Sequence, residues 1–251
     1  MKSQDEWMSI SDMMSGLMLI FMFIAISFMI QVESDKEKLE KNNQKLEILM
    51  KNAQKDKDRI KNIAITYNKD KKELNKDLHT EFFKDLEKWE AQITDDNIII
   101  FNSPTVLFES GKSMIKKDFK DILNDFFPRY IKILYSLKYR EEIDEVRIEG
   151  HTSTNWKNSI SVEEIYLKNM QLSQDRANQV LSYCYGLKNT IINQSRKWLE
   201  LHFRANGMAF AKLQYKDNNK TIVDETKSRR VEFKVQMKTE EKIYKILKAS
   251  E

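Results

Sequence analysis

The sequence predicts a single N-terminal transmembrane helix, a helical or coiled-coil stalk, and a C-terminal α/β domain. Three observations lead to this prediction: an uncharged apolar run near the N-terminus, a polar segment after it that lacks glycine and proline, and a C-terminal part in which short β-like runs alternate with helical ones. The expected boundaries are 1–12 for a short N-terminal segment, 13–32 for the span, 33–97 for the stalk, 98–240 for the α/β domain and 241–251 for a C-terminal tail.

The apolar run extends from Met13 to Val32 and has the length of a membrane span. Its 20 residues carry no charge, and as a helix they would cover about 30 Å, the thickness of a bilayer's hydrocarbon core. The alternative is a cleaved signal peptide, which needs a basic start and an A-x-A-like cleavage site. The first seven residues, MKSQDEW, are acidic on balance, and Gln31-Val32-Glu33 is a poor cleavage site. We therefore expect a retained single-pass anchor.

The segment 33–97 is expected to be a spacer. Two interpretations remain open: a weak coiled coil, whose seam would hold two copies together, and a solvated, partly helical stalk. A strict seven-residue series favours the coiled coil, whereas polar residues at second-seam positions such as Asn42, Asp56 and Asp70 weaken it. The series consists of Leu39, Leu46, Ala53, Ile60, Tyr67 and Leu74, with Leu49 and Ile63 at second-seam positions.

The C-terminal part is predicted to be a small sheet covered by helices. Its order, strand–helix–strand–helix–strand–strand, is typical of a compact α/β sandwich. The expected strands are Ile98–Phe101 with Thr105–Phe108, Asp144–Glu149, Leu199–Ala205 and Arg230–Gln236, and the expected helices are Lys116–Leu137, interrupted at Pro128, and Leu172–Leu187.

Composition excludes several classes of function. Lys and Arg number 43 and Asp and Glu number 39, so the net charge of +4 is a small difference between large numbers. Such balanced charge disfavours a surface dedicated to nucleic acid, and no direct nucleic-acid partner is expected. The single cysteine, Cys184, excludes an intrachain disulfide and a multi-cysteine metal site, and the three scattered histidines disfavour a zinc site. The chain shows neither a phosphate-binding loop nor a nucleophile–base pair, so we expect neither an enzyme nor a cofactor.

Five short motifs in the C-terminal part make it resemble the OmpA-like peptidoglycan-binding domain. The resemblance covers roughly residues 98–237. Each motif is weak alone, but all stand in the family's order. They are Val106-Leu107-Phe108 with Ser110-Gly111-Lys112-Ser113, then Ile148-Glu149-Gly150-His151-Thr152-Ser153, Leu172-Ser173-Gln174-Asp175-Arg176-Ala177, Asn206-Gly207-Met208 and Arg229-Arg230-Val231-Glu232.

This resemblance implies a site for the peptide stem of peptidoglycan. In the family, the cleft between the Gly-His-Thr loop and a helix arginine binds the carboxylates and amine of diaminopimelate. By position, Arg176 would clamp a carboxylate, Thr152 and Ser153 would contribute from the loop, and Asn169 and Leu172 would line the cleft. Ser173 is expected to be the N-cap of the helix that carries Arg176. His151 is expected to be a structural residue.

Two features depart from the family's pattern. The family usually has an aspartate at the position of Ser153, and that aspartate contacts the ligand's amine. The segment from Thr154 to Gln171 is also longer than usual, so an added loop is expected over the cleft.

The N-terminus resembles the entry to the single transmembrane helix of MotB-type stator subunits. The residues that carry this resemblance run from Trp7 to Met18, with Asp12 at the position of the family's ion-binding aspartate. The alternative is that Asp12 is an ordinary residue flanking the span. A carboxylate is costly within an apolar span, which makes one at its edge a functional candidate.

Together the two resemblances describe a stator B subunit. The short N-terminal segment, the Ser153 loop with its insertion and the NMQLSQDRA run resemble ZorB, the B subunit of Zorya anti-phage defence systems. The alternatives are a flagellar MotB-like stator and a cell-wall tether without motor activity. The resemblance implies a homodimer inside a ring of five multi-span MotA- or ZorA-like subunits, with Asp12 passing protons or, alternatively, sodium. It also implies an inner-membrane location with a cytoplasmic N-terminus and a periplasmic C-terminal domain, although three lysines after the span, against Lys2 alone before it, favour the opposite orientation.

Overall fold

The computed structural model describes residues 2–109, 111–154, 156, 161–217 and 220–238, and for 2–12, 104 and 105 the backbone only. The tail expected at 241–251 lies outside the described residues. The chain divides into two compact units, the first containing the N-terminal part up to Lys61 and the second beginning at Asn62.

The N-terminal part forms one helix, α1 (Lys2–Leu86), which includes the predicted span. All side chains from 13 to 32 are exposed to solvent. Within the described chain, α1 is the one helix apolar enough to cross a membrane, with a mean hydropathy of 2.4 in its best window. An apolar surface exposed over its whole circumference is what a lipid-embedded helix presents, so the structure agrees with the predicted anchor.

The end of α1 is part of the second unit's core. Leu74, Leu78 and Phe82 are fully buried there, whereas Leu39 and Leu46 in the first unit are exposed. The last member of the seven-residue series therefore packs within its own chain. The core begins earlier along the chain than the predicted domain boundary at residue 98.

Five strands form one mixed sheet in the order β1-β2-β5-β3-β4. Neighbouring strands are antiparallel except for β3 and β4, which run parallel and pair Gly150 with Gly207 at their ends. The strands are β1 (Ala91–Ile93), β2 (Ile98–Phe101), β3 (Ile143–Gly150), β4 (Phe203–Gly207) and β5 (Val231–Met237).

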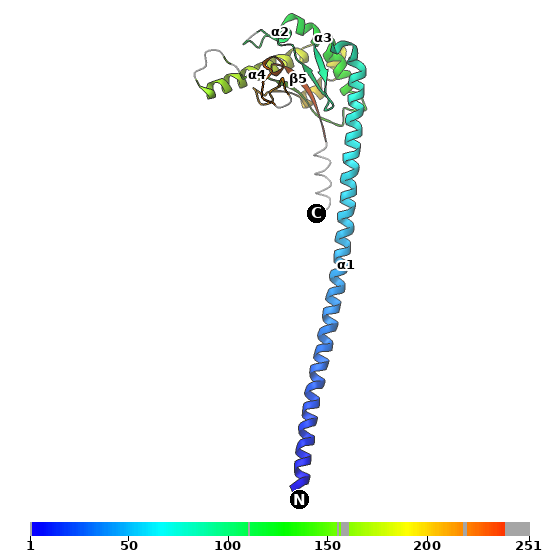
Figure 1. Ribbon diagram of the computed structural model, residues 1–251. Helices are drawn as coiled ribbons and strands as arrows, with labels where there is room; N and C mark the ends of the chain where they lie inside the picture. The colour runs from blue at the N-terminus through cyan, green and yellow to red at the C-terminus, as the bar shows by residue number, and fades with distance from the viewer. Residues whose placement is uncertain (1, 110, 155, 157–160, 218–219, 239–251) are drawn as a thin grey trace. The chain divides into compact units, whose positions relative to one another are not determined.

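Helices intervene in the order that the sequence predicts, with β1 and four short helices added (Figure 1). The predicted βαβαββ sandwich is therefore confirmed. The helices of the second unit after α1 are α2 (Pro104–Leu107), α3 (Lys117–Leu134), α4 (Val162–Tyr185), α5 (Thr190–Gln194), α6 (Arg196–His202) and α7 (Glu225–Ser228).

The core between helices and sheet is rich in aromatic rings. Phe126 of α3 packs against Phe101 of β2 and Phe233 of β5 with ring centroids 5.2 and 5.0 Å apart, both edge-on. Phe82 of α1 lies 5.2 Å from the same Phe126 ring. Edge-to-face packing adds to the free energy gained by burying these large rings. This cluster joins the end of α1, α3 and the sheet in one core.

Two predicted strands were placed wrongly. Thr105–Phe108 was expected to be a strand, but Pro104–Leu107 forms α2, and Phe108 makes only an isolated bridge to Ile115. Proline suits a first helical position because its missing N–H would have no partner there. The strand expected at Leu199–Ala205 begins only at Phe203, because Leu199 belongs to α6.

Two helix predictions also need correction. Pro128 lies inside α3 without ending it. The helix expected to begin at Leu172 begins ten residues earlier at Val162, where the Ser161 hydroxyl accepts a hydrogen bond of 3.1 Å from the Glu164 N–H. Ser161, and not Ser173, is therefore the N-cap. From Val162 to Gln171 the added segment expected as a loop forms nearly three further turns of α4.

Candidate functional site

The candidate site lies where the parallel strands β3 and β4 end against the middle of α4. A Cβ atom on Gly150 would lie 2.3 Å from the Ser173 carbonyl oxygen, and one on Gly207 would lie 2.6 Å from the Gln174 nitrogen. Both contacts are far below van der Waals distance and involve helix backbone, which cannot yield as a side chain would. Glycine at these two positions therefore lets the strand ends touch the helix.

Backbone hydrogen bonds hold the loop that follows Gly150. The Thr152 N–H donates to the Ala209 carbonyl at 2.8 Å, and the His151 N–H donates to the Arg230 carbonyl at 3.0 Å. The Ala209 N–H in turn donates to the Ser173 hydroxyl oxygen at 3.0 Å. The loop is thus fixed to α4 through the segment after β4, and Ser173 serves as a buried connector.

Arg176 of α4 is 7% exposed and contacts the segment that precedes α3. Its Nε donates to the Lys112 carbonyl at 3.0 Å, and its guanidinium lies 4.9 Å from the centre of the Phe108 ring. Burial, together with the charge of Arg229, lowers the pKa of Arg176 to about 10. The side chain therefore remains a cation at neutral pH, held beside a second cation in a poorly hydrated position. Such a pair favours an anionic ligand.

The other residues predicted for the cleft lie in the same region. Asn169, Leu172 and Arg176 are spaced so that they share one face of α4. Asn169 is buried and donates from Nδ2 to the Ile165 carbonyl of its own helix at 3.0 Å, while Leu172 is half-buried. Ser153 is 6% exposed. Arg176 lies in the middle of α4, not near its start.

Five buried polar atoms in or near the loop have no hydrogen-bond partner within the described chain: His151 Nδ1 and Nε2, Thr152 Oγ1, Arg229 Nε and Glu225 Oε2. Buried polar groups are normally paired, so unpaired ones indicate a place where a ligand supplies the partner. Sequence analysis did not identify Arg229 or Glu225 as site residues. Arg229 is the first residue of the Arg229-Arg230-Val231-Glu232 motif, and this position could have identified it as a site residue. Glu225 carries no local signal.

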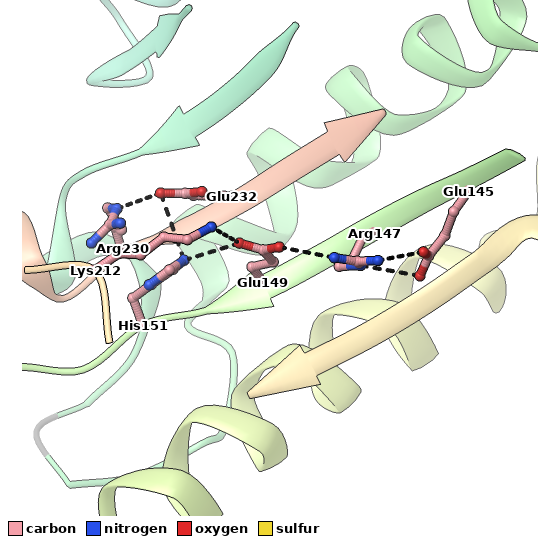
Figure 2. A network of polar contacts seen from close by, with 7 residues as sticks. All are labelled: Glu145, Arg147, Glu149, His151, Lys212, Arg230 and Glu232. Carbon is pink, nitrogen blue, oxygen red and sulfur yellow. Dashed lines mark hydrogen bonds and ion pairs between the residues drawn. The ribbon is translucent and has the colours of Figure 1, made fainter. Parts of the chain in front are cut away.

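A network of charges lies beside the loop on the sheet (Figure 2). Glu149 is fully buried, and its carboxylate lies 3.4 Å from both Arg147 and Lys212. Glu232 pairs with Arg230 at 2.6 Å. His151 Nε2 lies 3.6 Å from each carboxylate.

The acids of this network remain ionised. Burial by itself raises the pKa of Glu149, but His151 and the charges of Lys212 and Lys234 outweigh it and lower that pKa to about 2. His151 and Arg230 likewise overcome burial and lower the pKa of Glu232. The ligand atoms of Glu149, His151 and Glu232 lie within 4.8 Å of one another, which is close enough for a shared cation. Each carboxylate, however, already has a basic partner, so the cluster is a charge-compensated support for the loop.

The second candidate, Asp12, lies in α1 one residue before the apolar run. Its side chain lies outside the part that the structure describes. Its place in the helix rests on the backbone alone.

Comparison with known proteins shows to which family the chain is related. No protein-family model matches the chain. The Zorya protein ZorB of Escherichia coli strain Crooks is 40% identical over 249 residues, which is 98% of this chain and 94% of that protein.

Solved structures with a similar fold are more distant. A MotB-like protein from Desulfovibrio vulgaris has 18% identity and a TM-score of 0.44, covering 66% of this chain and 90% of that one. The periplasmic domain of Helicobacter pylori MotB has 18% identity and a TM-score of 0.39, covering 63% and 97%. The cell wall anchor of the type VI secretion system from Pseudomonas aeruginosa has 19% identity and a TM-score of 0.43, covering 64% and 97%.

The fold defines a class: proteins with an N-terminal apolar helix followed by an α/β domain in which helices pack on a five-stranded mixed sheet. Within that class, identity of 40% over nearly the whole of both sequences is decisive. The chain belongs to the ZorB family of Zorya proteins.

Proposed function

We propose that the chain is the B subunit of an ion-driven inner-membrane motor in a Zorya anti-phage defence system. Two copies would sit inside a ring of five multi-span ZorA-like subunits and be fixed to peptidoglycan. The observation that carries this proposal is the full-length match to ZorB, which includes both the N-terminal span and the wall-binding motifs.

The cleft has the chemistry that wall anchoring needs. Arg176 and Arg229 are close enough for the charge of one to lower the pKa of the other, and Arg229 Nε has no hydrogen-bond partner among the described residues. Guanidinium groups bind carboxylates through paired N–H donors. A carboxylate of the peptide stem would relieve the repulsion between the two cations and complete their hydrogen bonding.

Asp12 is the residue we assign to ion transfer. It stands at the edge of a span whose remaining 20 residues are uncharged. Moving one unit charge through 100 mV supplies about 2.3 kcal/mol, several times thermal energy, so a few ions can drive rotation of the ring around a held dimer. We assign the proton as the ion, with sodium as the alternative.

This mechanism requires a cytoplasmic N-terminus and a periplasmic C-terminal domain. Only that orientation puts the Arg176 cleft in the compartment that contains peptidoglycan. The lysines after the span oppose it, but large domains are translocated largely regardless of flanking charge.

The test is Asp12→Asn in cells that also contain the A subunit. The change keeps the size of the side chain and removes its titratable charge. Phage protection should be lost while protein level and association with the A subunit stay normal. Asp35→Asn, on an exposed part of α1 beyond the span, is the control and should protect fully. Full protection by Asp12→Asn would contradict the motor and leave a tether.

A further inference from the structure

We propose that Glu225 binds the amine of the wall peptide, replacing the aspartate that the OmpA-like family carries at the position of Ser153; this inference rests on the proposed wall binding. The amine ligand would be the side-chain amine of a diaminopimelate-type residue, whose neighbouring carboxylate binds the arginines. The site would thus recognise a zwitterion through residues from two different segments.

The position of Glu225 fits this role. Its Oε1 accepts a hydrogen bond of 3.0 Å from the hydroxyl of Thr154, the residue directly after Ser153. A carboxylate therefore stands beside the loop position where the family places one, although it comes from α7, 71 residues further along the chain. The relocation preserves the negative charge at this end of the cleft.

The second carboxylate oxygen of Glu225 is the atom that we expect to accept a hydrogen bond from the ligand. Oε2 is buried and has no hydrogen-bond partner within the described residues. An unpaired buried carboxylate oxygen is costly, and an ammonium group would supply up to three donors. Thr152 Oγ1, two residues before Thr154, is also buried and unpaired. A hydroxyl oxygen and a carboxylate oxygen both accept hydrogen bonds from an amine.

Capping of α7 does not account for Glu225. α7 is capped by Asp224, whose carboxylate accepts from the N–H groups of Thr226 and Lys227 at 3.1 and 3.0 Å. Glu225 is therefore not needed as the cap. No ion pair joins it to Arg229, four residues later, within the described chain.

The charges explain why a carboxylate matters here. With Arg176 and Arg229 alone, the cleft would favour any anion, including the free carboxyl terminus of a peptide. A carboxylate beside Thr154 adds a preference for a ligand that carries an amine as well as a carboxylate. Specificity of this kind depends on charges that would be left unpaired with the wrong ligand.

The experiment measures retention of the full-length chain, purified in detergent, on isolated sacculi. One batch is native and one has its free amines acetylated. The wild type should bind native sacculi about tenfold more tightly than acetylated ones, which is the effect expected for one charged hydrogen bond. Glu225→Gln should bind both batches equally, at the level of the wild type on acetylated sacculi. Glu141→Gln, at an exposed position, is the matched control and should behave as the wild type.

The double variant Ser153→Asp with Glu225→Gln separates recognition from folding. It restores the family's aspartate and should regain the preference for native sacculi. Glu225→Gln that still prefers native sacculi would overturn the proposal, as would a double variant that folds but shows no preference. Failure of the folded wild type to bind native sacculi would instead contradict the proposed wall anchoring itself.

Discussion

Glu149 and Glu232 lie directly opposite each other on neighbouring antiparallel strands, and both are buried and ionised. Like charges in facing positions normally destabilise a sheet. Here Arg147 and Lys212 contact one carboxylate, Arg230 contacts the other, and His151 lies 3.6 Å from both. The pair is therefore stable only while its cations remain in place, and the loop with Thr152 begins at this cluster.

The stability of the domain should fall in acid because of this cluster. The pKa of Glu149 is lowered from 4.5 to about 2. A lowered pKa stabilises the fold above the unfolded value of 4.5 and loses that contribution, about 3 kcal/mol, as the pH falls towards 2. Urea unfolding should show constant stability from pH 7 to 5 and a decline below pH 4.5.

Glu149→Gln tests the origin of this pH dependence. At pH 7 the variant should lose about 3 kcal/mol, because its neutral amide forgoes the interactions with His151, Lys212 and Lys234 that lower the pKa of Glu149. Its decline between pH 4.5 and 3 should be shallower than that of the wild type. An identical acid profile in the two proteins would show that the dependence arises elsewhere.

The affinity of the protein for native sacculi should fall tenfold or more in Arg176→Ala and in Arg229→Ala. Each removes a guanidinium that binds carboxylate, and Arg176→Lys should restore little because lysine lacks the planar pair of donors. Arg196→Ala, on α6, is the control. Circular dichroism confirms folding, and unchanged retention of a folded Arg176→Ala would place wall binding outside this cleft.

Phe82→Ala and Phe83→Ala form a matched pair for the end of α1. Phe82 is fully buried and Phe83 is 74% exposed. Truncation of a buried phenylalanine costs about 3–5 kcal/mol, whereas the exposed change should stay within about 0.5 kcal/mol. Trp89, whose ring centre lies 6.0 Å from that of Phe82, provides the fluorescence signal for unfolding. Equal stabilities would mean that α1 does not belong to the domain's core.

The orientation of the chain in the membrane can be tested by labelling one introduced cysteine. Cys184 is fully buried and should not react in the folded wild type, while Leu137 is 82% exposed. Leu137→Cys should react with a membrane-impermeant maleimide added to cells with a permeable outer membrane. Reaction only after lysis would place the domain in the cytoplasm and contradict the proposed orientation.

Local sequence patterns were sufficient for the span and the order of the sheet and helices. An uncharged 20-residue run and short apolar runs separated by polar ones depend on neighbouring residues only. The start of α4 was missed although Ser161 and Glu164 have the spacing of a capping box. The apolar residues Val162 and Leu167 after it are exposed and give no amphipathic pattern.

The long-range features of the site could not be predicted in the same way. Glu225 reaches Thr154 across 71 residues, and nothing in its neighbours indicates that contact. The burial of Leu74 within its own chain could not be predicted, because its place in the seven-residue series also fits a seam between two chains. The order of the motifs was sufficient to identify Arg176. Its contacts with residues far away in the sequence could be identified only from the folded structure.

The way α1 ends bears on how the protein carries load. Its last turns bury Leu78 and Phe82 in the core, and Arg129 of α3 forms ion pairs with Glu81 and Asp85 on the same turns. A force on these turns acts on buried apolar side chains and on ion pairs together. Rotation of the helix end would have to displace Phe82, whose ring packs against the rings of Trp89 and Phe126. Packing and ion pairs therefore hold the end of α1 against rotation relative to the sheet and α3.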